Sequence, residues 1–165
     1  MRREVCQSGG AKAEGGGDKV VDFDGYEIDD DPARVDFDAL WQSLSTDAYW
    51  SRWRSEDDVR RQVHHAWRII ASHASGGSMV GFARATSDGV AVAYLADVYV
   101  LAQHRGRGLA TAMLTELIDN GPGRDFRWML RTQDAHDLYR KLGFATPDHT
   151  YLERASPRSA PGEAD

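Results

Sequence analysis

Residues 98–111 read VYVLAQHRGRGLAT, and the order of residue types in this stretch decides the fold. An apolar, β-rich run comes first, a loop with two glycines and two arginines follows, and an amphipathic helix begins at the end. The first amides of a helix have no partner within the helix, and the helix dipole adds positive potential there. The stretch therefore predicts a strand, a loop and a helix that can together bind an anion.

The composition of the loop suits a phosphate, and a pyrophosphate better still. Gly106 and Gly108 allow a bulky anion to approach the backbone without a Cβ clash, and Arg105 and Arg107 offer charge-assisted hydrogen bonds. The alternative is an ordinary glycine turn with solvated arginines. A P-loop is excluded because no Lys-Ser/Thr follows the last glycine, and a Rossmann fingerprint because its third glycine and later acidic residue are missing.

Two apolar runs lie upstream of the loop. Met79–Thr86 and Val90–Leu101 are rich in β-forming residues, and the turn residues at 87–89 (Ser-Asp-Gly) predict a hairpin between them. Because the second run is long for one straight strand, we expect a bend or bulge near Leu95–Asp97 that splits it into two strands.

The chain before this hairpin predicts one strand and two helices. The strand covers 25–30 within an acidic stretch, and Pro32 ends it. Ser55 predicts the N-cap of the second helix, which we expect to run to about Ser72. The apolar residues at helical spacing are Phe37, Leu40, Trp41 and Leu44 in the first helix and Val59, Val63, Trp67 and Ile70 in the second.

The chain after the loop predicts a helix, a strand, a short helix and a last strand. The first helix has an apolar face and ends at 121–123 (Gly-Pro-Gly), and residues 126–130 alternate as a buried strand. Asp134 starts the short helix, and 150–154 is the last strand. The resulting order, β-α-α-β-β-β-α-β-α-β, predicts an α/β domain whose mixed sheet has an antiparallel hairpin and a parallel crossover.

Length and composition limit the classes of protein. The 165 residues fit one domain. The ends, 1–19 and 155–165, hold almost nothing to bury, so we expect disordered tails around a domain at 20–154. The net charge of −6 argues against a nucleic-acid partner, and the longest apolar run is too short to span a membrane. With no signal-like start and a single cysteine, Cys6, we expect a cytoplasmic protein.

A second segment, 134–144 (DAHDLYRKLGF), carries the other informative motif. Together the two segments resemble the GNAT superfamily of acetyl-CoA-dependent N-acetyltransferases. Residues 105–110 (RGRGLA) fit its phosphate-loop pattern Arg/Gln-x-x-Gly-x-Gly/Ala, and Leu138, Tyr139, Gly143 and Phe144 fit its Leu-Tyr-x-x-x-Gly-Phe motif. The two motifs stand in the family's order and at about its usual spacing.

The resemblance implies a fold and a coenzyme site. The fold is a single-domain mixed sheet, with antiparallel amino-terminal strands and a splayed parallel pair, flanked by about four helices. The strand edge pairs with the pantetheine arm of acetyl-CoA as an extra strand would, and the loop amides hold the pyrophosphate. The residues concerned are Val98, Tyr99 and Val100 at the strand edge and Arg105, Gly106, Arg107, Gly108, Leu109, Ala110 and Thr111 in and after the loop.

Near the sulfur of the coenzyme, the resemblance places Tyr139. A phenol of ordinary pKa, about 10, is about 1.5 units too weak to protonate a thiolate of ordinary pKa downhill, so we expect Tyr139 to stabilise the thiolate at least as much as to donate a proton. Its alternative is a packed core tyrosine. Many family members have an asparagine seven residues earlier that contacts the pantetheine. Here Thr132 stands in that place, so we expect the contact either to be weaker or to be supplied by Thr132 or Asp134.

The implied reaction is direct attack of an amine on the thioester. No cysteine is positioned as a nucleophile. A lysine-like amine has a pKa of about 10.4, so presenting it uncharged at neutral pH costs roughly 4.6 kcal/mol unless a base or a dry site helps. Asp97, the ionisable residue inside the apolar run, is the candidate base, directly or through water. The alternative is a carboxylate that stabilises a bulge or caps a helix.

The acceptor site is expected at the connection between the first two helices, which contains Tyr49, Trp50, Trp53 and Arg54. Its aromatic residues either hold an apolar or cationic acceptor or pack in the core. His136 either orients the acceptor or relays a proton, or it is a solvated residue of the short helix. His64 and His65 lack the partners of a metal site, so no metal is expected.

The sequence thus predicts an N-acetyltransferase that uses acetyl-CoA as cosubstrate. The acceptor is a primary amine of a small molecule or an exposed peptide, with no nucleic-acid or membrane partner, and the protein is a monomer or homodimer. One alternative is a noncatalytic acyl-CoA-binding or sensor module on the same fold, and another is a generic α/β interaction domain.

Overall fold

A computed structural model describes residues 19–46 and 53–154 of the chain. Its centre is one six-stranded sheet in the order β1-β2-β3-β4-β5-β6. The strands are β1 (Val21–Phe23), β2 (Tyr26–Asp29), β3 (Arg68–His73), β4 (Met79–Ser87), β5 (Val92–Val100) and β6 (Arg127–Met129). Neighbours from β1 to β5 are antiparallel, and β5 and β6 are parallel. The expected mixed sheet is confirmed.

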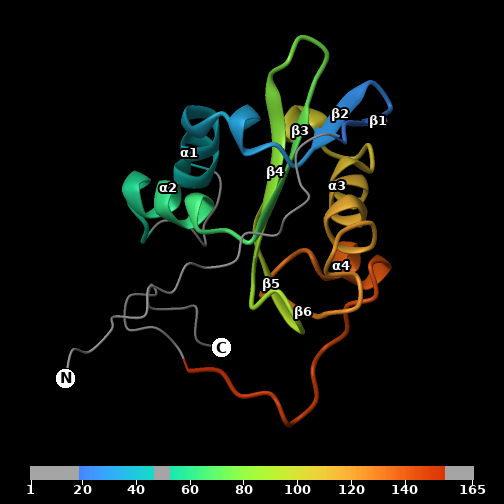
Figure 1. Ribbon diagram of the computed structural model, residues 1–165. Coiled ribbons are helices and arrows are strands. Elements are labelled where there is room, and N and C mark those ends of the chain that lie inside the picture. The colour runs from blue at the N-terminus through green and yellow to red at the C-terminus, as the bar shows by residue number, and fades with distance from the viewer. Residues whose placement is uncertain (1–18, 47–52, 155–165) are drawn as a thin grey trace, which may run out of the picture.

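The α-helices of the described residues cover the two faces of the sheet (Figure 1). They are α1 (Phe37–Thr46), α2 (Glu56–His64), α3 (Leu109–Ile118) and α4 (His136–Lys141), with 3₁₀ turns at Pro32–Arg34 and Ala102–His104. On one face, α1 and α2 pack over a core cluster that includes Phe82 and Tyr99. On the other, α3 and α4 pack over a cluster that includes Leu95 and Val100. Of the described helices, none has the length and apolarity that a bilayer span requires.

The second helix is shorter than its apolar spacing predicts. Ser55 caps α2 as expected, because its side chain accepts from the Asp58 amide while the Asp58 carboxylate accepts from the Ser55 amide. The helix ends at His64, however, and Arg68–His73 form β3, so the expected continuation to Ser72 is wrong. Ile69 and Ile70 are β-branched, and pairing with β4 outweighs the helical spacing there.

At the ends of the domain, the strand expected at 25–30 is present as β2 but is not the first strand, and the last expected strand is wrong. A strand, β1, precedes the one expected at 25–30, because Asp24 (φ 51°) and Gly25 (φ 80°) form a tight hairpin turn. Residues 150–154 form no strand. Tyr151 and Leu152 there are 46% and 91% exposed, so this segment lacks a buried face that would fix it against a neighbour.

The expected irregularity in the long apolar run is present, but the run stays one strand. Asp97 has a φ of 54°, and the register with β4 shifts there. Two residues of β5, Asp97 and Val98, oppose the single residue Ala83, which is a β-bulge. The bulge bends β5 without splitting it, so the expectation of two strands is wrong.

Gly81 of β4 allows α3 to lie close against the sheet. A Cβ at this position would lie 2.6 Å from Ser72 Oγ and 2.9 Å from Met113 Sδ of α3. We therefore expect Gly81→Ala to lower the free energy of unfolding by about 1–3 kcal/mol, measured by urea denaturation, because the helix or the strand must shift to make room. The control is Ser78→Ala, at the exposed residue just before β4, which should leave the unfolding midpoint unchanged. Equal midpoints for both variants would contradict this account of the packing.

Candidate active site

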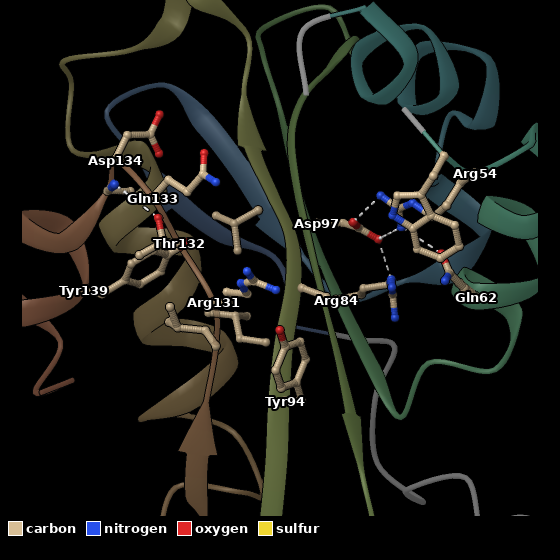
Figure 2. Close-up of a pocket in the computed structure, with 16 residues that line it drawn as sticks. Arg54, Gln62, Arg84, Tyr94, Asp97, Arg131, Thr132, Gln133, Asp134 and Tyr139 are labelled. Carbon is tan, nitrogen blue, oxygen red and sulfur yellow. Dashed lines mark hydrogen bonds and ion pairs between the residues drawn. The ribbon is translucent and has the colours of Figure 1, made fainter. Parts of the chain in front are cut away.

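A cleft opens where β5 and β6 stop pairing. The two strands pair from Val92 and Arg127 to Tyr94 and Met129. Beyond those residues, a cavity of about 270 Å³ lies between the segment that continues β5 and the segment that follows β6. It is lined by Leu95, Ala96, Asp97 and Val98 after the pairing on β5, by residues 130–135 after β6, and by Tyr139 of α4. Trp53, Arg54, Gln62, Arg84 and Tyr94 complete the lining (Figure 2). The cleft therefore has walls from both sides of the sheet.

Asp97 is the centre of a buried ion-pair cluster in one wall. Arg54 donates from Nη2 to Oδ1 at 2.7 Å and from Nη1 to Oδ2 at 2.9 Å, and Arg84 donates from Nε to Oδ2 at 2.6 Å. Arg54 Nη1 also donates to Gln62 Oε1 at 2.7 Å. Asp97, Arg54 and Arg84 are only 6%, 7% and 7% exposed, so water does little to screen these pairs. Figure 2 shows the two guanidinium groups on either side of the carboxylate.

The cluster fixes the charge of Asp97. Burial raises the pKa of Asp97, but the hydrogen bonds and charges of Arg54 and Arg84 outweigh burial and hold it below its ordinary value. A carboxylate with a lowered pKa is a weak proton acceptor. This geometry favours the alternative in which Asp97 stabilises the bulge, while its role as a base remains a prediction.

Tyr139 lies in the opposite wall and is held by the end of its helix. After α4, Gly143 takes a φ of 83°, and the amides of Gly143 and Phe144 donate to the carbonyls of Arg140 and Tyr139. This is a Schellman ending, in which the residue after the glycine packs back on the helix. The Phe144 ring accordingly makes an edge contact with the Tyr139 ring, with centroids 5.8 Å apart. The Tyr-x-x-x-Gly-Phe motif therefore fixes the orientation of the Tyr139 side chain toward the cleft.

Thr132 and Asp134 lie between β6 and α4 and also line the cleft. Thr132 Oγ1 accepts a hydrogen bond from the Ala135 amide at 3.1 Å, at the start of α4. Figure 2 shows Thr132 beside the Tyr139 ring. The structure thus brings together the three residues that the sequence predicts near the reactive end of the coenzyme.

The glycine loop continues from the end of β5 into α3. Gly106 and Gly108 have φ values of 77° and 79°, which favour glycine. The first hydrogen bond of the helix runs from the Ala112 amide to the Gly108 carbonyl, so the amides of residues 109–111 precede it and have no partner within the helix. Arg105 Nε donates to the Val100 carbonyl at 2.7 Å, which ties the loop to the end of β5.

The predicted coenzyme residues do not all line the cleft. Val98 does, whereas Tyr99, Val100 and residues 105–111 lie outside its lining. Leu109, at the start of α3, and Tyr139 nevertheless belong to one apolar cluster, so the loop helix and the cleft wall are parts of one packed unit.

Of the predicted acceptor residues, Trp53 lines the cleft and is 38% exposed. The guanidinium carbon of Arg54 lies 5.9 Å from the centroid of its ring. Tyr49 and Trp50 lie outside the described residues. His136 is exposed and does not line the cleft. Within 19–46 and 53–154, no group of three or more His, Cys, Asp or Glu side chains could hold a metal ion.

Sequence reasoning missed several cleft residues: Gln62, Arg84, Tyr94, Arg131 and Gln133. For one of these residues, Arg84, the sequence contains a signal that could have pointed to it. Arg84 is the charged residue inside the apolar run 79–86, as Asp97 is inside the run 90–101. In the structure, Ser87 still belongs to β4 and pairs with Ala93. The same register pairs Arg84 with Ala96, next to Asp97. The turn predicted at 87–89 would have paired Arg84 with Val92, so the sequence showed the two charges but not their register.

Comparison with known proteins gives one consistent result. Residues 29–144 match the acetyltransferase (GNAT) family. A protein of Gibberella zeae named as an acetyltransferase is 31% identical over 140 residues, which are 72% of this chain and 78% of that protein. Serotonin N-acetyltransferase 2, chloroplastic, of Oryza sativa subsp. japonica is 34% identical over 97 residues, 56% of this chain and 48% of that protein, so the match spans about half of that relative.

A solved structure agrees with these sequence matches. It is an acetyltransferase from Xanthomonas campestris pv. campestris, assigned to the GNAT family, with a TM-score of 0.74 and 32% identity. The similarity covers 81% of this chain and 94% of that chain.

The ion-pair cluster predicts a large effect of removing the buried negative charge. Asp97→Asn leaves Arg54 and Arg84 buried without a counter-charge, so we expect the free energy of unfolding to fall by about 3–5 kcal/mol. Urea denaturation at neutral pH measures this. The matched control is Asp137→Asn, which removes an exposed pair with Arg140 and should have little effect.

The sign of the pH dependence follows from the lowered pKa of Asp97. Its stabilisation is complete above the unfolded value of about 3.9 and is lost as the pH falls through the folded value. The free energy of unfolding of the wild type should therefore fall more steeply with acidification than that of Asp97→Asn. Parallel curves would show that Asp97 is not held ionised by its partners.

Proposed function

Since the chain belongs to the GNAT family of acetyltransferases, which take the acetyl group from acetyl-CoA, we propose that it transfers this group to a primary amine of a small molecule or peptide. The observation that carries the proposal is the cleft between the diverging ends of β5 and β6, with Tyr139 in one wall. The name of the rice relative, a serotonin N-acetyltransferase, agrees with an amine acceptor.

The coenzyme would lie along the end of β5. Beyond Tyr94 this strand no longer pairs with β6, so its backbone edge can pair with the amides of the pantetheine arm. The amides at the start of α3 would take the pyrophosphate, where Gly106 and Gly108 keep the approach open and the helix dipole adds attraction. Arg107 is exposed beside them. Arg105 uses Nε for its hydrogen bond to the Val100 carbonyl, so its terminal nitrogens can donate to the same anion.

The transfer would be a direct displacement in a ternary complex. The uncharged amine nitrogen attacks the thioester carbonyl carbon, a C–N bond forms, and the C–S bond breaks with its electron pair going to sulfur. The product nitrogen loses a proton, and the coenzyme thiolate takes one. Because no described residue is a cysteine, none of the groups in the cleft can form an acyl-cysteine intermediate.

Tyr139 would act on the leaving thiolate. Its hydroxyl can donate a hydrogen bond to the sulfur as negative charge develops there, and the Schellman ending of α4 holds its ring in place. Thr132 and Asp134 would orient the pantetheine beside it.

The proton of the acceptor ammonium needs another route. The lowered pKa of Asp97 makes this carboxylate a weak base, so we propose that the proton leaves to water at the solvent side of the cleft, where Trp53 and Tyr94 are each 38% exposed. Asp97 would then serve mainly to hold Arg54 and Arg84 in the wall.

A substitution in the glycine loop tests whether the loop binds the coenzyme. Isothermal calorimetry should detect binding of coenzyme A to the wild type, with a dissociation constant that rises about tenfold in Gly106→Ala. The added Cβ narrows the approach to the amides, and the φ of 77° becomes strained. Gly77→Ala is the matched control, because Gly77 has a φ of 85° and, like Gly106, nothing within 4 Å of an added Cβ.

Both glycine variants should lose similar stability, about 1–2 kcal/mol, because both place alanine in the left-handed region. Equal affinities for coenzyme A in the two variants would exclude the loop as the pyrophosphate site. Absence of coenzyme A binding by the wild type would overturn the proposed function.

The hydroxyl of Tyr139 tests the chemical step. Tyr139→Phe should lower kcat at least about tenfold, measured as thiol release from acetyl-CoA with an amine acceptor, while calorimetry finds nearly normal coenzyme A affinity. Tyr151→Phe, which removes the hydroxyl of an exposed tyrosine, is the control. An unchanged kcat in Tyr139→Phe would remove this residue from the mechanism.

A further inference from the structure

The wall of the cleft that contains Asp97 has more positive than negative charge. Arg54 and Arg84 share the single carboxylate of Asp97, which already accepts three hydrogen bonds from them. Both arginines are 7% exposed, so the cluster keeps a net charge of one positive unit largely away from water. An uncompensated buried charge is costly, and a fold that retains one has a place for a counter-charge.

Arg84 is the arginine with donors to spare. Both terminal nitrogens of Arg54 donate to Asp97, and one of them donates to Gln62 as well. Within the part of the chain that the structure describes, Arg84 donates only from Nε, so its two terminal nitrogens are available. Arg84 lines the cleft, and these nitrogens form the second planar edge of its guanidinium, which suits a carboxylate.

The other described charged groups around the cleft do not occupy the terminal nitrogens of Arg84. Asp134 lies beside Thr132, in the wall across β5 from the cluster (Figure 2). Arg131 pairs with Glu153 at 3.4 Å, and both side chains are about half exposed. Neither acidic residue hydrogen-bonds Arg84 in the described structure, and Arg131 adds a further positive charge to the cleft lining.

Resting on the proposed function, we infer that the amine acceptor also carries a carboxylate, which the terminal nitrogens of Arg84 bind. An acceptor with this group restores neutrality to the Arg54–Asp97–Arg84 cluster. Diamines and polyamines are disfavoured, because their second ammonium would face a net positive wall. The aromatic rings of Trp53 and Tyr94, which line the cleft near the arginines, suit the apolar part of an amino acid.

The experiment uses pairs of acceptors that differ only in the carboxylate. The pairs are tyrosine and tyramine, tryptophan and tryptamine, phenylalanine and phenethylamine, leucine and isopentylamine, and lysine and cadaverine. Thiol release from acetyl-CoA gives kcat/KM for each, and mass spectrometry verifies the acetylated amine. With the wild type, the carboxylate-bearing member of the best pair should exceed its partner about tenfold or more, as expected for one charge-assisted contact.

Variants of Arg84 test whether this residue makes the contact with the carboxylate of the acceptor. In Arg84→Gln the ratio of kcat/KM within that pair should fall toward one, mainly through a higher KM of the carboxylate-bearing acceptor. Arg61→Gln is the matched control, because Arg61 is an exposed arginine of α2 paired with Asp58, and the ratio should stay at its wild-type value. Circular dichroism checks that each variant is folded. If Arg84→Gln does not fold, Arg84→Lys keeps the charge and removes the planar edge, and it should lower the ratio.

Three results would overturn the inference: equal kcat/KM within every pair, preference for the decarboxylated amines, or no acetylation of any of the ten compounds. An unchanged ratio in the folded Arg84 variant would remove Arg84 from the contact. The proposed function is judged separately, since coenzyme A calorimetry and acetylation of the decarboxylated amines do not depend on a carboxylate.

Discussion

The bulge at Asp97 is the constraint on which the site depends. Leu95 and Val100 belong to the apolar cluster under α3 and α4, whereas Tyr99 belongs to the cluster under α1 and α2. An uninterrupted strand would place Leu95 and Tyr99 on the same face, so the extra residue at the bulge is what allows β5 to serve both clusters. Asp97 takes a φ of 54° that costs free energy for a residue with a side chain, and its hydrogen bonds to Arg54 and Arg84 offset that cost. The cleft begins just before this point, where the pairing of β5 with β6 ends.

Much of the fold was predictable because several residues act locally. Ser55 caps a helix through contacts within one turn, and Gly108 begins another through its own backbone freedom, so a short window of sequence is enough to find them. The end of α2 could not be predicted in this way, because Ile70 has a helical spacing from Val63 and also suits a buried strand. Its state is decided by pairing with β4, outside the short window in which the helical spacing is read. Residues 150–154 are exposed and pair with no strand among the described residues.

The residues of the candidate site also fall into two groups: those set by local motifs and those set by contacts between distant elements. Tyr139 and its Gly143-Phe144 ending are a local motif, and the structure places Tyr139 at the cleft. The cluster around Asp97 joins Arg54, from the residues before α2, to two strands, and no spacing in the sequence brings Arg54 there. Arg84 and Asp97 lie in one hairpin, but the register that pairs Arg84 with Ala96 depends on a loop longer than the turn predicted at 87–89. Contacts across distant elements are therefore the part of the site that sequence reasoning lacked.

The two halves of the proposed reaction consequently differ in what likeness to known acetyltransferases can establish. The coenzyme half depends on a strand edge, on helix amides and on glycines in the left-handed region, and backbone groups of this kind accompany the fold whatever the surrounding side chains are. The acceptor half depends on which side chains line the wall, and here those are two buried guanidinium groups around one carboxylate. Because a buried ion pair stabilises a protein little more than apolar packing does, a net positive wall is poorly explained by stability alone. A binding role for the unmatched charge gives it a physical reason, and that reason concerns the acceptor and not the coenzyme.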